Sequence, residues 1–426
     1  MKRVLIITYY WPPAGGPGVQ RWLYFVKYFR EFGIEPVVYI PKNAHYPLQD
    51  ESFVAEVPSD IELISQPVQE PYKIAKWFSK KKTKEMSSGI IAKKNLSAVE
   101  KLLLYIRGNF FIPDARVGWV KPSVVFLKKY LTEHPVDTVV TSGPPHSLHL
   151  IGLQLKKELD VAWLADFRDP WTTIHYHDSL RLTKKSQKKH KQLEAEVLQT
   201  ADTITVTSPT TKKEFEAITN RPVKTITNGF ERKETITTNL DAKFSIAHIG
   251  SLLSERNPAL LWEVLNELAY KVEGFREDLE IVLAGVVGEE ISESVSSFGL
   301  SQNLRNVGYV SHKEALQLQH NAQLLLLLEI DSPETRAIIP GKLFEYIRAE
   351  RPIIAIGPDG SDIKAVLEES KSGTFFTSAE KKQLKTSIVD FYKAYKNDGI
   401  QGGAVHISKY TRKHLTKKMA QILKEL

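Results

Sequence analysis

Apolar runs of strand length alternate with amphipathic stretches along most of the chain. In the first half, the runs with the length and composition of buried strands cover residues 4–8, 36–40, 137–142, 162–167, 203–207 and 223–227. Stretches with helical periodicity separate them, at residues 19–32, 148–159 and 184–199 and from Pro209 onward. Gly33 suits the C-terminal cap of the first helix. This alternation predicts a parallel sheet covered by helices.

The second half repeats the pattern, with predicted strands at residues 245–250, 279–284, 324–330, 352–356 and 374–376. Between the halves, Asn228-Gly229 indicates a turn, and residues 233–241 are polar without periodicity, as in a linker. We therefore expect an α/β protein of two Rossmann-like domains, residues 1–235 and 242–405, followed by an amphipathic helix at 406–426. A basic helical insertion at about 70–130 interrupts the first domain. Ligands of such sheets bind outside the carboxyl ends of the strands, so we expect the domains to face each other across a shared cleft.

The composition is that of an ordinary soluble globular protein, with 42% hydrophobic and 25% charged residues. The 426 residues include no cysteine, which excludes disulfides, thiolate zinc sites and cysteine nucleophiles and fits a reducing cytoplasm. The first apolar run is too short for a signal peptide, and no apolar segment approaches the ~20 residues that span a bilayer. We expect a cytoplasmic protein, soluble or peripheral to the inner face of the cell membrane.

The net charge of +8 is partly local. Between Lys73 and Arg107, ten Lys and Arg residues stand against two Glu, and they are interleaved with Trp77, Phe78 and further apolar residues. This mixture favours contact with an anionic membrane surface. A solvated helical surface explains it equally well, and a nucleic-acid backbone fits it less well, so we expect no nucleic-acid partner.

Residues 339–357 carry the most informative motif. A buried strand precedes them, and Pro340 suits the first position of a helix that Pro352 ends. Lys342 and Glu345 then project from the same side of the first turns. A helix start is a natural anion site, to which Lys342 adds a point charge for a phosphate and Glu345 adds acceptors for sugar hydroxyls. The alternative is an ordinary surface ion pair.

Two other strand-to-helix loops carry related signals. Gly250 and Ser251 open a loop in which Arg256 is placed to bind a diphosphate with its planar guanidinium. After the first strand, Gly15 and Gly16 lie in a Pro/Gly-rich loop where backbone N–H groups can approach a phosphate or a sugar. That loop is neither a Walker A loop nor a dinucleotide fingerprint, and a plain Pro/Gly turn is the alternative.

Polar clusters follow two further strands of the first half. His146 and His149 follow one strand, and Arg168 and Asp169 follow the next. His146 or Asp169 is placed to position an acceptor hydroxyl or a sugar and to handle a proton, with Arg168 beside them. The alternatives are a turn at Asp169-Pro170 and a helix-facing role for His149. A metal site built from His175, His177 and Asp178 is disfavoured, because two histidines in one loop are usually only polar.

With these residues assembled, the chain resembles the GT4-type family of GT-B glycosyltransferases, and most of all its bacterial surface-polysaccharide branch. The resemblance covers nearly the whole chain and rests on an ordered set of motifs: Tyr-Tyr-Trp-Pro-Pro-Ala-Gly-Gly, Ser-Gly-Pro-Pro-His, Arg-Asp-Pro-Trp, Thr-Asn-Gly, Gly-Ser-x5-Asn-Pro and Pro-Gly-Lys-Leu-Phe-Glu-Tyr. It implies a GT-B architecture, with the C-terminal helix packing back toward the N-terminal domain. It also implies that the N-terminal domain binds the acceptor and the C-terminal domain binds the nucleotide sugar.

The resemblance further implies a retaining, metal-independent transfer of a hexosyl or N-acetylhexosaminyl group. The donor it implies is a nucleotide diphosphate sugar, used as co-substrate without a cofactor, and the acceptor it implies is a saccharide, in particular a lipid-linked one. Lys342 and Arg256 would bind the donor pyrophosphate, Glu345 the ribose, and Gly15 and Gly16 would lie near the donor phosphate and the acceptor.

Two positions depart from the family pattern. Ala337 stands where an acidic residue is common, and Ser251 stands where an arginine is frequent. Two alternatives therefore remain: a GT-B-like sugar-nucleotide epimerase and a catalytically inactive nucleotide-sugar-binding partner.

Overall fold

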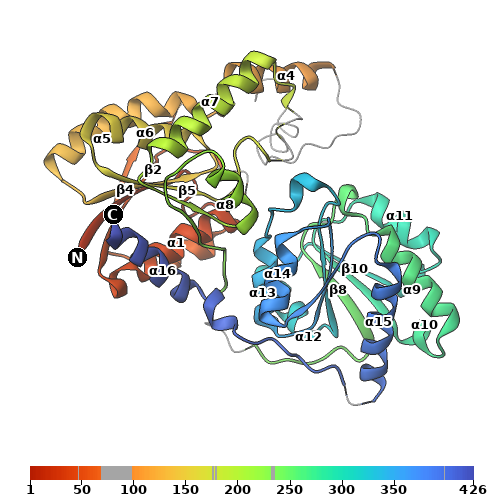
Figure 1. The fold of residues 1–426 in the computed structure, drawn as a ribbon. Helices are drawn as coiled ribbons and strands as arrows, with labels where there is room; N and C mark the ends of the chain where they lie inside the picture. The colour runs from red at the N-terminus through yellow and green to blue at the C-terminus, as the bar shows by residue number, and fades with distance from the viewer. Residues whose placement is uncertain (47, 69–97, 175–176, 178–179, 232–235, 398) are drawn as a thin grey trace. The chain divides into compact units, whose positions relative to one another are not determined.

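A computed structural model describes residues 1–46, 48–68, 98–174, 177, 180–231, 236–397 and 399–426 of the protein. The chain forms two compact units. Unit 1 contains Met1–Asn228 together with Arg412–Leu426, and unit 2 contains Gly229–Thr411. In Figure 1, the returning C-terminal segment is the dark blue helix beside the red start of the chain.

Unit 1 is built on a seven-stranded, wholly parallel sheet in the order β3-β2-β1-β4-β5-β6-β7. Its strands are β1 Lys2–Ile7, β2 Ile34–Pro41, β3 Glu62–Gln66, β4 Thr138–Gly143, β5 Ala162–Phe167, β6 Thr203–Val206 and β7 Val223–Thr225. Its helices are α1 Pro17–Phe29, α4 Ala98–Phe110, α5 Val120–Glu133, α6 Ser147–Leu159, α7 Lys184–Thr200, α8 Pro209–Glu216 and α16 Arg412–Glu425. The side chains of β1 alternate between two apolar cores, one under α5 and α6 and the other under α1 and α16.

Unit 2 is built on a six-stranded parallel sheet in the order β10-β9-β8-β11-β12-β13. Its strands are β8 Phe244–Ile249, β9 Leu279–Ala284, β10 Leu304–Gly308, β11 Leu324–Leu328, β12 Ile353–Ile356 and β13 Gly373–Phe376. Its helices are α9 Ala259–Lys271, α10 Phe275–Asp278, α11 Glu289–Ser297, α12 His312–Asn321, α13 Gly341–Ala349, α14 Asp362–Ser370 and α15 Lys381–Lys396. One face of the sheet carries α12, α13 and α14, and the other carries α9, α10 and α15 (Figure 1).

The helix α16 completes unit 1, although unit 2 precedes it in the sequence. It lies along α1, where Leu415, Met419 and Leu423 are buried in the same core as Val19 and Trp22. The predicted return of the C-terminal helix to the N-terminal domain is thus confirmed. The predicted continuous helix at 406–426 is wrong at its start, because a 3-10 turn Ile407–Tyr410 and an extended Thr411 come before α16.

Three further details differ from the sequence-based expectation. The edge strands β3 and β10 were missed, because most of their side chains are exposed or only half-buried and give no apolar run. Pro340 is the N-cap of α13 and not its first residue, since its ψ of 145° is extended. The helix ends at Glu350, which has a left-handed φ of 57°, before Pro352 can constrain the chain.

Only part of the basic insertion is described, as α4, the 3-10 turn Val117–Trp119 and α5. Trp77, Phe78 and Lys80–Lys82 lie outside the described residues. Within the described ranges, no helix is both long enough and apolar enough to cross a membrane.

Candidate functional site

The N-terminus of α13 meets the carboxyl ends of β8 and β11 in unit 2, and the meeting point gathers two cations. Lys342 comes from the first turn of α13, and Arg256 from the 3-10 turn Ser254–Arg256 after β8. Gly250 leaves room for the ammonium group of Lys342. Its φ is 126°, and a Cβ there would lie 2.8 Å from Lys342 Nζ. Ser251 is exposed beside it.

Lys342 is held by a histidine that comes from the adjacent strand β8. His248 Nδ1 lies 2.9 Å from the carbonyl oxygen of Leu326, which can only accept, so Nδ1 carries the proton. His248 Nε2 then accepts a hydrogen bond from Lys342 Nζ at 3.2 Å, which is nearer than the carbonyl oxygen of Ser251 at 3.5 Å. Burial and the nearby ammonium hold the pKa of His248 well below its usual value, so the ring stays neutral. Burial also lowers the pKa of Lys342 to about 8.

Arg256 faces a buried carboxylate, Glu329, which directly follows β11. The closest atoms, Arg256 Nη2 and Glu329 Oε2, are 3.6 Å apart, which is an ion pair beyond hydrogen-bond range. The Glu329 side chain is only 3% exposed, and Oε2 has no hydrogen-bond donor among the described residues. Burial raises the pKa of Glu329, while the charges of Arg256 and Lys342 oppose that rise.

Glu345 lies one turn beyond Lys342 on α13. It does not pair with Lys342: its Oε2 accepts a hydrogen bond of 3.2 Å from Gln319 Nε2 of α12. The next residue, Tyr346, fixes the helix to the end of β8, because its hydroxyl accepts from Ile249 N at 2.8 Å and donates to Ile249 O at 3.2 Å. Lys342 and Glu345 are therefore presented by a helix whose orientation is set by a buried phenol.

Three strand-end loops also meet in unit 1, where β1, β4 and β5 are neighbours. Arg168 joins them. Its guanidinium donates to the carbonyl of Pro144, stacks over the ring of Tyr10 at 5.7 Å, and occupies the space where a side chain at Gly18 would lie, 1.9 Å from a Cβ there. Burial lowers the pKa of Arg168, and Asp169 beside it opposes that effect. Arg168 and Asp169 thus lie where the three loops converge.

His146 is buried in the same region. It stacks on Trp171 with ring centroids 5.0 Å apart and an interplanar angle of 2°. Neither of its ring nitrogens has a hydrogen-bond partner among the described residues. Burial holds its pKa well below the usual value, with the neighbouring histidines and Arg168 acting in the same direction. His146 is therefore a neutral imidazole with one unused acceptor nitrogen.

His149 is packed among core side chains. It stacks on Phe167 at 4.1 Å, and its Nδ1 lies 2.9 Å from Thr141 Oγ1, which itself accepts from Trp163 Nε1. Burial lowers the pKa of His149 to about 3. His149 is thus a packed core histidine.

The glycine-rich loop after β1 is tied to the chain beyond β2. Gly15 N–H donates to the carbonyl of Leu48 at 2.9 Å, so this N–H is not directed at a ligand. Gly16 has a φ of 94° and immediately precedes α1.

Of the suggested metal ligands, His175 and Asp178 lie outside the described residues. His177 packs against His190 with ring centroids 4.7 Å apart. Within the described ranges, no group of three His, Asp or Glu side chains is placed to hold a metal ion.

A buried ion pair between Arg21 and Asp166 supports the strand-end loops of unit 1. Asp166 receives five hydrogen bonds: two from Arg21 and one each from Trp22, Ser142 and Thr205. Arg21 also donates to the carbonyls of Ile226 and Thr227. Burial raises the pKa of Asp166, but the charge of Arg21 and its hydrogen bonds to Asp166 outweigh that effect and hold the pKa below its usual value. The network connects α1, β4, β5 and β6.

The sequence interpretation missed two residues of the unit 2 site, His248 and Glu329. Both lie in or beside runs that were interpreted only as apolar strands. Polar residues at the carboxyl ends of such strands were the available signal.

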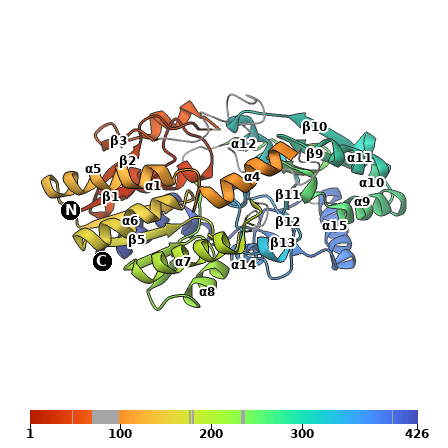
Figure 2. The ribbon, with the colours of Figure 1, turned by 90° about the horizontal axis from the view of Figure 1, so that it is seen from above.

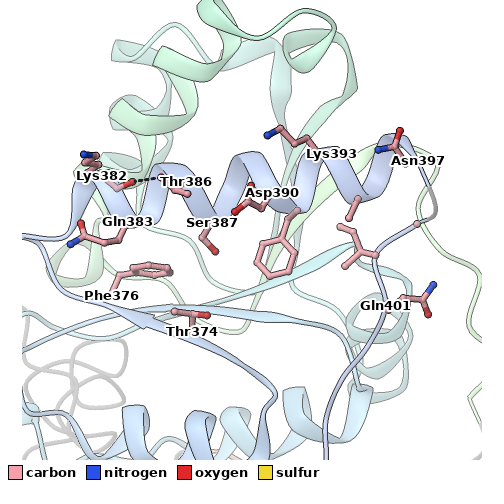
Figure 3. A pocket seen from close by; sticks show the side chains of 14 residues that line it. Thr374, Phe376, Lys382, Gln383, Thr386, Ser387, Asp390, Lys393, Asn397 and Gln401 are labelled. Carbon is pink, nitrogen blue, oxygen red and sulfur yellow. Dashed lines mark hydrogen bonds between the residues drawn. The ribbon is translucent and has the colours of Figure 1, made fainter.

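A hollow of about 1030 Å³ lies elsewhere in unit 2, along the polar side of α15 and beside the edge strand β13 (Figure 3). Its lining includes Thr374, Phe376, Gln383, Ser387 and Asp390 and none of the candidate residues. It is therefore separate from the site around Lys342.

Neither a protein-family model nor a curated protein matches the sequence. Solved structures do match its fold. A structure of Anabaena Alr3699/HepE in complex with UDP-glucose is 13% identical, covers 100% of both chains and gives a TM-score of 0.61. The apo form of the lipopolysaccharide outer core galactosyltransferase WaaB gives the same three values. A putative UDP-N-acetylglucosamine 2-epimerase from Listeria monocytogenes is 11% identical, with a TM-score of 0.55, and the match covers 100% of this chain and 96% of that one.

At these identities the similarity establishes a shared fold. The prediction of a GT-B fold with two Rossmann-like domains is confirmed. The glycosyltransferases and the epimerase share this architecture, so the reaction has to be argued from the residues of the site.

Proposed function

We propose that the protein is a retaining glycosyltransferase of the GT4 type that moves a hexosyl or N-acetylhexosaminyl group from a nucleotide diphosphate sugar to a saccharide acceptor. In this proposal the acceptor is lipid-linked and the transfer needs no metal. The reaction belongs to cell-surface polysaccharide biosynthesis. The observation that carries it is the pair Lys342 and Arg256 around Gly250, with Glu345 one turn along the same helix.

In this proposal unit 2 binds the donor. Lys342 and Arg256 bind the pyrophosphate and stabilise the charge that develops on it as the sugar leaves. Gly250 and Ser251 allow the phosphates to approach the backbone, and the free acceptor capacity of Glu345 binds the ribose hydroxyls. The lowered pKa of Lys342 supports this role, because an anion would restore the charge that burial disfavours.

Unit 1 binds the acceptor in this proposal. Gly15 and Gly16 provide a loop of small cross-section, and Arg168 and Asp169 position the hydroxyl that attacks. His146 is buried behind them as a neutral imidazole stacked on Trp171, and in this proposal it supports the loop that carries Arg168 and Asp169. The hydroxyl attacks on the face from which the diphosphate leaves, and the leaving diphosphate takes up its proton. Positioning supplies most of the rate enhancement in such a mechanism.

The test is release of free UDP or GDP from a panel of nucleotide sugars, with and without saccharide acceptors. The proposal predicts release that requires an acceptor. Lys342→Ala and Glu345→Ala should weaken donor binding and turnover, whereas Lys364→Ala, on an exposed position of α14, should change neither. Unchanged binding and turnover in the first two variants would remove the site assignment.

The same experiment distinguishes the two alternatives. An epimerase converts the nucleotide sugar to its epimer without an acceptor, and the structural similarity to a putative 2-epimerase favours including it. A binding partner without activity is stabilised by nucleotide sugars and converts none of them.

A peripheral contact with an anionic membrane is part of the proposal, and α4 supports it. Four large apolar side chains share one side of this helix and are exposed: Leu102 by 57%, Tyr105 by 39%, Ile106 by 36% and Phe110 by 72%. Such a stripe on a surface helix is typical of an interaction site. The α4 helix lies beside α7 in both views (Figures 1 and 2), linked through Asn109, which accepts from Thr183 N.

The neighbouring helix α7 adds positive charge. Its first two turns expose lysines at 184, 185, 188, 189 and 191. An apolar stripe beside a lysine cluster matches a bilayer with anionic head groups. Each basic residue near such a surface contributes about 1 kcal/mol to the free energy of membrane binding.

Vesicle co-sedimentation tests this contact. Lys184→Gln with Lys188→Gln should weaken binding to vesicles rich in phosphatidylglycerol by roughly 25-fold. The matched control is Lys417→Gln with Lys418→Gln on the exposed side of α16. Equal binding to neutral vesicles, or concentration-dependent dimerisation that Phe110→Ser abolishes, would instead assign the stripe to another partner.

A further inference from the structure

Glu329 is out of place in a site for an anion. It is a carboxylate at the end of the all-leucine strand β11, and it faces the cations that would bind a pyrophosphate. Its position is fixed, because its N–H donates to the carbonyl of Ile356 at 2.9 Å and its Cβ lies 3.1 Å from where a Cβ on Gly357 would lie. The backbone of Glu329 is therefore fixed, and its side chain is buried beside the cations.

The charges around Glu329 come from three elements. Arg256 contributes a positive charge from the turn after β8, and Lys342 contributes another from α13, where Glu345 is paired with Gln319. His248 of β8 is neutral and accepts from Lys342. On the side of β12 and β13, Glu329 Cβ lies beside Gly357, and Phe375 lies against the same glycine; neither carries a charge. With Glu329 ionised, the carboxylate compensates one of the two cations.

A pyrophosphate beside Arg256 and Lys342 changes this balance. It brings its own negative charges to the same guanidinium and ammonium groups. An ionised Glu329 would then be a buried carboxylate next to another anion, without a hydrogen bond to Oε2, which is a costly arrangement. Protonation removes the repulsion and turns Oε2 into a hydrogen-bond donor.

We propose that Glu329 is a proton-coupled counter-charge of this anion site: its carboxylate balances Arg256 in the free protein, and it takes up one proton from solvent when a pyrophosphate binds the two cations. The proton returns to solvent when the nucleotide leaves. Glu329 acts through Arg256 and the ligand charge, so it is a positioning residue and not a catalytic one. This inference rests on the proposed donor site and adds a linkage between donor affinity and pH.

The test is isothermal titration calorimetry with UDP-glucose and with GDP-mannose, whose pyrophosphates stay fully ionised. Each titration is run at about pH 6.5 in two buffers of different ionisation enthalpy. Lys342 is almost fully protonated there, since its pKa is about 8, so its own titration contributes little. We expect the wild-type protein to take up a substantial fraction of one proton per ligand bound. Its affinity should fall as the pH rises toward 7.5.

The informative variant is Glu329→Gln, which keeps the shape and removes the charge. It should bind the same nucleotide sugar roughly tenfold more tightly near neutral pH, without proton uptake. Glu263→Gln, on the exposed side of α9, is the matched control and should behave as the wild type.

Three results are decisive. Binding without proton uptake by the wild type overturns the inference and leaves the proposed donor site intact. Uptake that persists in Glu329→Gln assigns the proton to another group, which also overturns it. If no nucleotide sugar of the panel that tests the proposed function binds to any of these proteins, the proposed function itself fails. The wild-type measurement stands even if the variant does not fold.

Discussion

Lys342 Nζ lies 3.2 Å from His248 Nε2, and the histidine can only accept because its Nδ1 proton is used by Leu326. The ammonium of Lys342 is thus directed by a neutral ring. A lysine in the first turn of a helix is otherwise a long, freely rotating side chain. The arrangement holds the cation beside Gly250, where the candidate donor site requires it.

Replacing His248 tests this arrangement. His248→Gln offers an acceptor at the place of Nε2, whereas His248→Asn keeps the donor to Leu326 and removes that acceptor. We expect the Asn variant to bind a nucleotide sugar about tenfold more weakly, and the Gln variant to bind it within about threefold of the wild type. Equal losses in both variants, measured by calorimetry, would indicate a packing role only.

The pKa of Lys342 predicts a second pH dependence. Burial lowers it to about 8, so above that pH the free protein carries a neutral amine. Affinity for a nucleotide sugar should therefore fall by up to about tenfold per pH unit above pH 8. Lys342→Arg stays charged and should lose this dependence.

The effect of Lys342 on stability has the opposite sign. Its pKa is lower in the folded than in the unfolded chain, so the unfolded chain binds more protons between about pH 8 and the ordinary lysine pKa. The contribution of Lys342 to stability should rise with pH across that window. Chemical denaturation of the ligand-free wild type and of Lys342→Met would detect it, and a variant with the same slope would contradict it.

The Asp166 network predicts a stability defect confined to unit 1. Asp166→Asn leaves the fully buried Arg21 without its counter-charge, which costs about 3–5 kcal/mol. Because Arg21 lowers the pKa of Asp166, the stabilisation is present above the unfolded pKa of aspartate and lost as the pH falls through the folded value. Denaturant unfolding should show this loss, while nucleotide-sugar binding by unit 2 should be unchanged. Asp160→Asn, an exposed residue, is the control.

The close approach of Arg168 to Gly18 predicts that changes at the two positions have a coupled effect on turnover. A Cβ at Gly18 would lie 1.9 Å from Arg168 Nη1, so Gly18→Ala must displace the guanidinium from the loops that it joins. We expect acceptor-dependent turnover to fall at least tenfold in Gly18→Ala and in Arg168→Ala, and the double variant to be no worse than either single one. Additive losses would show that the two residues act separately.

Most of the fold is predictable because its central strands are buried on both faces and appear as continuous apolar runs. The edge strands β3 and β10 have no continuous apolar run, because their side chains are exposed or half-buried. In the candidate site, Lys342, Glu345 and Arg256 were predicted from motif and spacing. His248 and Glu329 were not, because a polar residue in a leucine- or isoleucine-rich run gives no sign of which charged side chain the fold will bring beside it. Likewise, the sequence did not reveal that Arg168 fills the space above Gly18, since that contact joins residues 150 positions apart.

The position of α16 in the chain has a consequence for synthesis. Unit 1 emerges first from the ribosome, yet Leu415, Met419 and Leu423 reach its core only after all of unit 2 has been translated. Until then, the apolar side of α1 is open to chaperones and to neighbouring nascent chains. The core of unit 1 therefore cannot be completed until α16, which follows unit 2 in the chain, has been synthesised.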